Sequence, residues 1–186
     1  MNLPNKLTLL RVILIPIFIV FFILGCSYNY DYMYINIYRL LAAIIFVIAS
    51  ITDYFDGKIA RKYNLITNFG KLMDPLADKM LVITALFLLS INNEVNYICT
   101  LIVILRELII SSIRLIALEK GQVIAASKLG KYKTATQMVS IVLILFNIYK
   151  FNNYLCIITY GLFYISMFFV IVSLIDYILK NKLVFE

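Results

Sequence analysis

The chain has 186 residues, of which 63% are hydrophobic and 15% charged, and its formal net charge is +7. A soluble domain of this size has no interior large enough to bury so much apolar surface, and six Gly, three Pro and three Cys residues exclude collagen-like and disulfide-stapled chains. We therefore expect an integral membrane protein, whose positive charge orients it in the bilayer and does not indicate a nucleic-acid partner.

Six apolar stretches have lengths suited to helices that cross a hydrocarbon core about 30 Å thick. In chain order they run at about 9–26, 35–57, 74–91, 96–118, 134–149 and 154–179. The connections between them are short and contain neither a repeat nor a low-complexity linker. The sequence predicts an all-α polytopic membrane protein, a bundle of six transmembrane helices that forms one domain over residues 1–186.

Basic residues alternate between the two sides of this predicted bundle. Lys and Arg are absent from the connections at 26–34 and 92–95. They are present before the first stretch, after the last, and in the connections at 58–73, 119–133 and 150–153. By the positive-inside rule, both termini and the two long basic connections are cytosolic. The Tyr-rich run at 28–38 then lies at the outer interface, where aromatic rings anchor membrane helices.

The first stretch and the cysteines each have a second interpretation. The first stretch resembles a signal peptide that ends before Cys26, but the five apolar stretches after it favour a retained helix. Cys26, Cys99 and Cys156 form no CxxC pair and the chain has no His, so zinc and haem sites lack their usual ligands. We expect buried free thiols; a disulfide is the alternative, since all three lie near predicted outer helix ends.

Four aspartates gather where the second stretch ends and the third begins: Asp53, Asp56, Asp74 and Asp78. Their spacings of i, i+3 and i, i+4 place each pair on one face of a helix. One Asp at the centre of a bilayer costs about 2.5 to 3.5 kcal/mol on insertion scales, so four need water, a cation, or both. Because the donors are all oxygen atoms, the pattern favours Mg²⁺ or Mn²⁺ at the cytosolic face, and two ions could share a phosphate.

Several of these residues have a structural explanation when taken alone. Asp74 followed by Pro75 is typical of a helix N-cap, and Asp56 followed by Gly57 is typical of a turn. The small residues Gly57 and Ala60 also suit close packing of a neighbouring helix. These explanations account for single positions but not for the convergence of four carboxylates.

The spacing of these residues resembles the signature of the CDP-alcohol phosphatidyltransferases, DxxDGxxAR followed after eight residues by GxxxDxxxD. Every specified position is matched, by Asp53, Asp56, Gly57, Ala60, Arg61, Gly70, Asp74 and Asp78. The resemblance implies a homodimeric six-helix membrane enzyme that transfers a phosphatidyl group from a CDP-lipid to an alcohol. It also implies that the four aspartates bind Mg²⁺ or Mn²⁺ and that Asp78 is the general base. The implied CDP-lipid contacts are Gly57, Ala60, Arg61, Gly70 and, from the first helix, Thr8.

Three flanking segments, 2–16, 105–108 with Arg114, and 130–138, resemble family members whose acceptor is glycerol 3-phosphate. Arg106 and Arg114 lie within the fourth apolar stretch, where a guanidinium requires a partner. Glu107 points about 100° away from Arg106 on an ideal helix, so we expect an acceptor phosphate to be that partner. Pairing with an Asp of another helix is the alternative. The expected acceptor-phosphate ligands are Arg106, Arg114, Lys128, Lys131 and Lys133.

The expected reaction converts CDP-diacylglycerol and glycerol 3-phosphate into phosphatidylglycerol phosphate and CMP at the cytosolic face of a membrane. One alternative is a sister enzyme whose acceptor is phosphatidylglycerol, as in cardiolipin synthesis, or an inositol phosphate. An alternative of another class is a cation transporter that binds its ion through the same carboxylates. A transporter gives no reason for Gly57, Ala60, Arg61 and Gly70 at these spacings.

Overall fold

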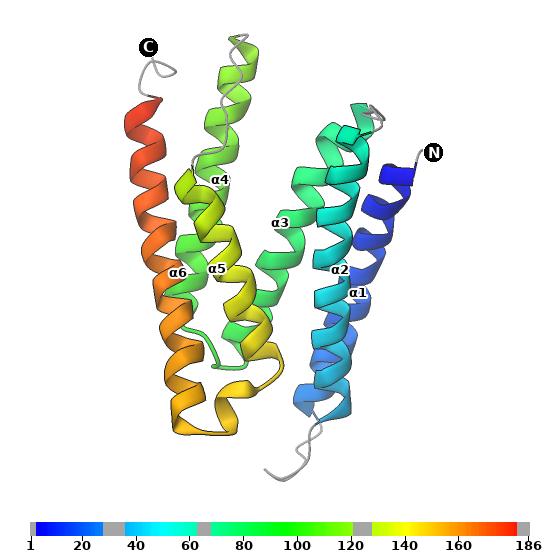
Figure 1. Cartoon of the computed structure of the whole chain (residues 1–186), viewed down its shortest axis with the longest axis vertical. Helices are drawn as coiled ribbons and strands as arrows, with labels where there is room; N and C mark the ends of the chain where they lie inside the picture. Colours follow the sequence, from blue (N-terminus) through cyan, green and yellow to red (C-terminus); the bar gives the residue numbers. More distant parts are fainter. Residues whose placement is uncertain (1–2, 28–35, 63–67, 121–127, 182–186) are drawn as a thin grey trace. The chain divides into compact units, whose positions relative to one another are not determined.

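The computed structural model describes residues 3–27, 36–62, 68–120 and 128–181, without the side chains of 3–7, 53–62, 68–75, 78, 118–119 and 128. Over these residues the backbone forms six α-helices and a short 3₁₀ turn (Figure 1). The prediction of an all-α chain is confirmed. The helices form two compact units, Met1–Asn92 and Asn93–Glu186.

The first unit contains α1 (Leu3–Ser27), α2 (Ile37–Lys62) and α3 (Asn68–Ile91). α1 packs against both α2 and α3 (Figure 1). Phe18 of α1 lies against Phe46 of α2, with ring centroids 5.9 Å apart. Ala42, Ala43 and Ala49 of α2 are fully buried, and side chains this small let membrane helices approach closely. Aromatic rings and alanines therefore form the core of this unit.

A buried arginine lies where α1 and α2 meet. Arg39, a basic residue inside the second apolar stretch, is only 4% exposed, and its guanidinium carbon lies 4.1 Å from the centre of the Phe22 ring. Cation–π attraction of this kind stabilises a charge that has left water. Nearby, the Asn36 side-chain amide donates a 2.6 Å hydrogen bond to the carbonyl oxygen of Gly25. The charge of Arg39 is thus accommodated inside the unit.

Gly25 is required for this close contact. A Cβ atom on Gly25 would lie 2.9 Å from the backbone nitrogen of Arg39, too close for two packed helices to remain in place. We expect Gly25→Ala to lower the free energy of unfolding by about 1 to 3 kcal/mol, as overpacking does. Gly161→Ala is the matched control, since a Cβ there meets no atom within 4 Å. Thermal unfolding in detergent, followed by circular dichroism, tests this, and equal melting temperatures for the two variants would contradict it.

The second unit contains α4 (Tyr97–Glu119), α5 (Lys128–Leu145), the 3₁₀ turn η1 (Ile148–Lys150) and α6 (Asn153–Lys180). α6 packs against both α4 and α5. Buried residues of α6 recur at alternating intervals of four and three: Thr159, Phe163, Ser166, Val170, Ser173 and Tyr177. A heptad spacing that alternates small polar with apolar residues is a packing seam between helices.

The fifth helix begins and ends earlier than predicted. The sequence predicts a stretch at about 134–149, whereas α5 runs from Lys128 to Leu145. Asn147 adopts a left-handed conformation, with φ 54° and ψ 27°, which ends the helical path before η1. Lys131 and Lys133 therefore lie within the first two turns of a helix and not in a loop.

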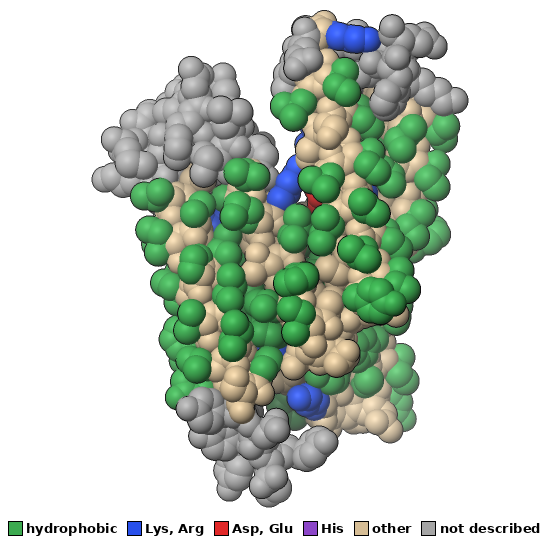
Figure 2. Space-filling view, turned by 180° about the vertical axis from the view of Figure 1, so that it is seen from behind, with side chains coloured by type: hydrophobic (Ala, Val, Ile, Leu, Met, Phe, Trp, Pro, Cys, Tyr) green, Lys and Arg blue, Asp and Glu red, His purple; other side chains and the backbone are tan. Residues whose placement is uncertain are grey.

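The outer faces of the helices are apolar. Ile157, Phe168 and Leu108 are 70%, 63% and 58% exposed, and Figure 2 shows hydrophobic side chains along the visible helices with few charged ones between them. A surface of this kind is typical of contact with lipid tails. By length and composition, the segments Thr8–Ser27 and Asn153–Lys180 can cross a membrane. Shorter apolar helical segments occur at Ile37–Thr52 and Lys79–Ile91.

Cys26, Cys99 and Cys156 are free thiols, so the disulfide alternative is wrong. All three are partly exposed, so the expectation of full burial is also wrong. They lie near helix ends, where side chains have fewer helical neighbours than in the middle of a bundle. Most of the Tyr-rich run, residues 28–35, lies outside the described residues.

Candidate active site

Two helices of the first unit carry the eight signature residues. Near its C-terminal end α2 carries Asp53, Asp56, Gly57, Ala60 and Arg61, and near its N-terminal end α3 carries Gly70, Asp74 and Asp78. The side chains of these residues lie outside those that the structure describes. The backbone is helical at all eight positions, and α2 and α3 contact each other (Figure 1). The helical spacing thus places each aspartate pair on one face of its own helix.

Two of the structural explanations for single residues of the signature, the turn and the N-cap, are wrong. α2 continues through Asp56 and Gly57 to Lys62, so these residues do not form a turn. α3 begins at Asn68, six residues before Asp74, so Asp74 is not the N-cap of that helix. The predicted third stretch starts at Asp74 because the prediction followed hydrophobicity. The helical residues before Asp74 are too polar to belong to an apolar stretch. Both corrections leave the aspartates inside continuous helices.

The chemistry of the donor set fits a hard divalent cation. Among the side chains that the structure describes, no group of three or more Asp, Glu, His or Cys residues could hold a metal ion. The signature supplies four carboxylates from two helices in contact, and the chain contains no His. Mg²⁺ and Mn²⁺ prefer such oxygen ligands. The metal-site hypothesis therefore rests on Asp53, Asp56, Asp74 and Asp78.

Polar residues of α1 lie buried within the same unit. Thr8 is 1% exposed and Arg11 is fully buried, three residues further along the helix. α1 contacts both signature-bearing helices. A fully buried guanidinium requires polar or anionic surroundings. Thr8, which the resemblance assigns to the CDP-lipid, is thus an interior residue of the unit that carries the signature.

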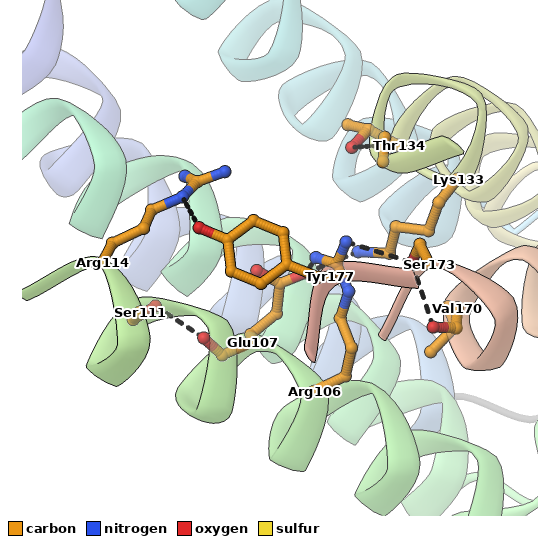
Figure 3. Close-up of polar contacts among 10 residues, drawn as sticks. Arg106, Glu107, Ser111, Arg114, Lys133, Thr134, Val170, Ser173 and Tyr177 are labelled. Atoms are coloured by element: carbon orange, nitrogen blue, oxygen red, sulfur yellow. Dashed lines mark hydrogen bonds and ion pairs between the residues drawn. The ribbon is translucent and has the colours of Figure 1, made fainter. Parts of the chain in front are cut away.

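A second polar cluster, formed by Arg106, Glu107 and Lys133, lies in the other unit (Figure 3). Oε1 of Glu107 is 2.7 Å from Nη1 of Arg106 on the same helix, α4, and 2.7 Å from Nζ of Lys133 on α5. The side chains of Arg106, Glu107 and Lys133 are 9%, 13% and 5% exposed. Two buried cations from two helices thus share one carboxylate oxygen. We call this group the charge triad.

Residues of α6 extend the charge triad. Nη2 of Arg106 donates to the hydroxyl of Ser173 at 3.2 Å, and Nε of Arg114 donates to the hydroxyl of Tyr177 at 3.3 Å. The Arg114 guanidinium also lies 5.8 Å from the centre of the Tyr177 ring. Because Ser173 and Tyr177 are four residues apart, one face of α6 holds both arginines (Figure 3). Both arginines of α4 are therefore held against α6, while Lys133 of α5 pairs with Glu107 of α4.

The prediction that Glu107 points away from Arg106 and need not neutralise it is wrong, since the two side chains form a 2.7 Å ion pair. Although the two Cα–Cβ directions differ by about 100° on an ideal helix, both side chains are long enough to curl to the same side. In an apolar bundle the attraction between opposite charges favours that curl. The alternative was that Arg106 pairs with an Asp of another helix. Among the described contacts, the partners of Arg106 are instead Glu107 and Ser173.

Of the five expected acceptor ligands, the structure brings Arg106 and Lys133 together around Glu107. Arg114, two turns after Arg106 on α4, contacts Tyr177 of α6. Lys131 is exposed, and the side chain of Lys128 lies outside the described residues. Sequence reasoning missed Glu107, Ser173 and Tyr177. The heptad spacing of buried residues along α6 is the signal that could have indicated the last two.

Comparison with known proteins agrees with the signature. The sequence pattern of the CDP-alcohol phosphatidyltransferases matches residues 1–175, which include helices of both units. The CDP-diacylglycerol–glycerol-3-phosphate 3-phosphatidyltransferase of Bacillus subtilis is 38% identical over 97% of this chain and 95% of its own length. The Haemophilus influenzae protein of the same name is 38% identical over 97% of this chain and 94% of its own length. The Rickettsia bellii protein of that name is 46% identical over 74% of this chain and 71% of its own length.

The matched region contains every position of the signature on α2 and α3, and also the charge triad on α4 and α5. Since the family pattern covers most of the chain and relatives at 38% identity cover nearly all of it, the chain belongs to the CDP-alcohol phosphatidyltransferase family of membrane-embedded transferases.

Proposed function

We propose that this protein transfers the phosphatidyl group of CDP-diacylglycerol to sn-glycerol 3-phosphate, giving phosphatidylglycerol phosphate and CMP. The observation that carries this proposal is the similarity, over 97% of the chain, to relatives named for that reaction. The buried cations Arg106 and Lys133 and the partly buried Arg114 support it, because an acceptor that bears a phosphate needs such a site.

The first unit holds the groups that act on the CDP-lipid. The family uses a divalent metal ion, and Asp53, Asp56, Asp74 and Asp78 would hold it. When bound, it would stabilise the negative charge that develops on the diphosphate and on the departing CMP. Gly57, Ala60, Arg61, Gly70 and Thr8 are assigned to the CDP-lipid. Glycine and alanine leave room for the nucleotide against the helix, and Arg61 supplies charge complementary to its phosphates.

Asp78 is the proposed general base. It takes the proton from the primary hydroxyl of glycerol 3-phosphate as that oxygen attacks the phosphorus that bears the diacylglycerol. The new phosphorus–oxygen bond forms while the bond from that phosphorus to the bridging diphosphate oxygen breaks, and CMP leaves with the electron pair. The proposed ligands of the acceptor phosphate are Arg106, Arg114, Lys128, Lys131 and Lys133, of which Arg106 and Lys133 belong to the charge triad.

An acceptor panel tests the proposed function. Purified protein receives CDP-diacylglycerol and Mg²⁺ with glycerol 3-phosphate, phosphatidylglycerol or an inositol phosphate, and CMP release is measured. We expect release with glycerol 3-phosphate and its loss when EDTA removes the metal. Preference for another acceptor would identify a sister enzyme. Ion flux into vesicles without consumption of CDP-diacylglycerol would identify a transporter.

The proposed topology has six membrane spans, both termini and the active site at the cytosolic face, and a homodimeric assembly in one domain over residues 1–186. It rests on the alternation of basic residues, on the long apolar segments Thr8–Ser27 and Asn153–Lys180, and on the apolar helix exteriors. Cys26, near the end of α1, and Cys99 and Cys156, near the starts of α4 and α6, then all lie near the outer face.

Thiol labelling in intact cells tests this topology. We expect a membrane-impermeant maleimide to label the partly exposed thiols Cys26, Cys99 and Cys156 from outside. The matched control is Lys180→Cys at the other end of α6, in a variant that lacks the three native cysteines; it should react only after the membrane is permeabilised. Labelling of Lys180→Cys, but not of the native thiols, in intact cells would indicate the opposite orientation.

A further inference from the structure

The charge triad contains a carboxylate where the proposed reaction needs only cations. Arg106, Glu107 and Lys133 come from α4 and α5, and both ion pairs of Glu107 measure 2.7 Å to the same atom, Oε1. A carboxylate repels a phosphate dianion, so direct contact between Glu107 and the acceptor phosphate is unfavourable. The role of Glu107 must therefore lie in what it does to the two cations.

The geometry points to a positioning role. Because Nη1 of Arg106 and Nζ of Lys133 each lie 2.7 Å from one oxygen, they lie within twice that distance of each other. Two like charges this close, with side chains only 9% and 5% exposed, repel strongly unless an anion lies between them. Glu107 supplies that anion before any acceptor binds. It also links α4 to α5, which the two cations alone would drive apart.

The net charge of the triad explains how it could still bind an anion. One carboxylate neutralises one of the two cations, so the triad retains a charge of +1, and Arg114 adds a further positive charge held by Tyr177. Ser173 fixes the second amino group of Arg106 at 3.2 Å, which leaves less side-chain freedom to lose when a ligand binds. A phosphate monoester that enters this unit would thus find its cationic partners already oriented.

We propose that Glu107 is a positioning residue of the acceptor site, which holds Arg106 and Lys133 in the arrangement that binds the phosphate of the acceptor. The inference rests on the proposed function, since it assumes an acceptor that carries a phosphate. It assigns to Glu107 an effect on acceptor binding and none on the recognition of CDP-diacylglycerol.

Steady-state kinetics of Glu107 variants test this role. Glu107→Gln keeps the shape and one acceptor oxygen but removes the charge, and we expect it to raise KM for glycerol 3-phosphate about 10-fold or more. We expect KM for CDP-diacylglycerol to change by less than about 2-fold. Glu107→Asp retains the charge on a shorter side chain and should restore part of the affinity. Asp176→Asn is the matched control, because Asp176 forms its ion pair with the exposed Lys180.

A double-mutant cycle separates positioning from a general loss of stability. If Glu107 acts by holding Lys133, then Glu107→Gln raises KM for glycerol 3-phosphate much less in a Lys133→Met background than in the wild-type protein. Fully additive effects, or equal changes in KM for both substrates, would overturn the proposal. If Glu107→Gln does not fold, the same cycle is run with Glu107→Asp.

The wild-type protein distinguishes the two levels of failure. If it releases no CMP with glycerol 3-phosphate, the proposed function fails. If it does, and the Glu107 variants bind glycerol 3-phosphate as the wild type does, only the positioning role fails.

Discussion

Replacing Asp78 with Asn is expected to lower the rate of CMP release by about 10²- to 10⁴-fold, the usual contribution of a general base. Asn has nearly the same shape as Asp, but it cannot accept the proton of the attacking hydroxyl and is a poorer ligand for a hard cation. Asp78 lies in the helical part of α3, and an amide at this position leaves the backbone hydrogen bonds of that helix in place. The measurement is single-turnover CMP release with saturating CDP-diacylglycerol and glycerol 3-phosphate.

Asp176→Asn provides the control for this experiment. Asp176 is another helical aspartate, on α6, and pairs with the exposed Lys180 at 2.7 Å. An exposed pair of this kind contributes about 0 to 1 kcal/mol, so turnover should remain close to that of the wild type. Near-normal turnover of Asp78→Asn in folded protein would remove Asp78 as the proposed base.

The second large effect is expected from Lys133→Met. Methionine fills much of the space of the lysine stem but cannot bind phosphate, while Glu107 keeps its 2.7 Å ion pair with Arg106. A hydrogen bond to a charged group is worth about 1.5 to 3 kcal/mol, so KM for glycerol 3-phosphate should rise by about 10- to 100-fold. We expect KM for CDP-diacylglycerol to remain nearly the same, which initial-rate measurements with each substrate varied in turn will check.

Lys150→Met is the matched control for this variant. Lys150 lies in η1 of the same unit, is exposed, and has its amino group 5.6 Å from the centre of the Tyr149 ring. Removing this charge should leave both KM values unchanged. An unaltered KM for glycerol 3-phosphate in folded Lys133→Met protein would contradict the assignment of Lys133 to the acceptor phosphate.

Local spacing predicted the helical nature of the signature but not the extent of its helices. The spacings Asp53–Asp56 and Asp74–Asp78 indicated one face of each helix, and α2 and α3 are helical over both pairs. Turn and cap preferences at Gly57 and Asp74 predicted helix ends that do not occur. Such preferences are weak and are readily overridden by tertiary context, whereas an i, i+3 or i, i+4 repeat is a property of the helix itself.

The partners of the buried cations could not be predicted in this way. The sequence shows that Arg106 is a charged residue within an apolar stretch and needs a partner. It does not show that the partners are its chain neighbour Glu107 and Ser173, which is 67 residues away. Arg39 lies inside the second apolar stretch and not in a connection, and its guanidinium packs against the ring of Phe22 on another helix. Long side chains can reach several neighbours, so the packing of helices selects among them.

By itself, the sequence determined the membrane character, the all-α class and the family, because these depend on composition and on spacings within two adjacent helices. Only the tertiary structure decided that Glu107 lies between Arg106 and Lys133, and that Tyr177 supports Arg114. The physical reason is that helical periodicity is local, whereas a buried charge is neutralised by whichever groups the docking of helices brings within a few ångströms.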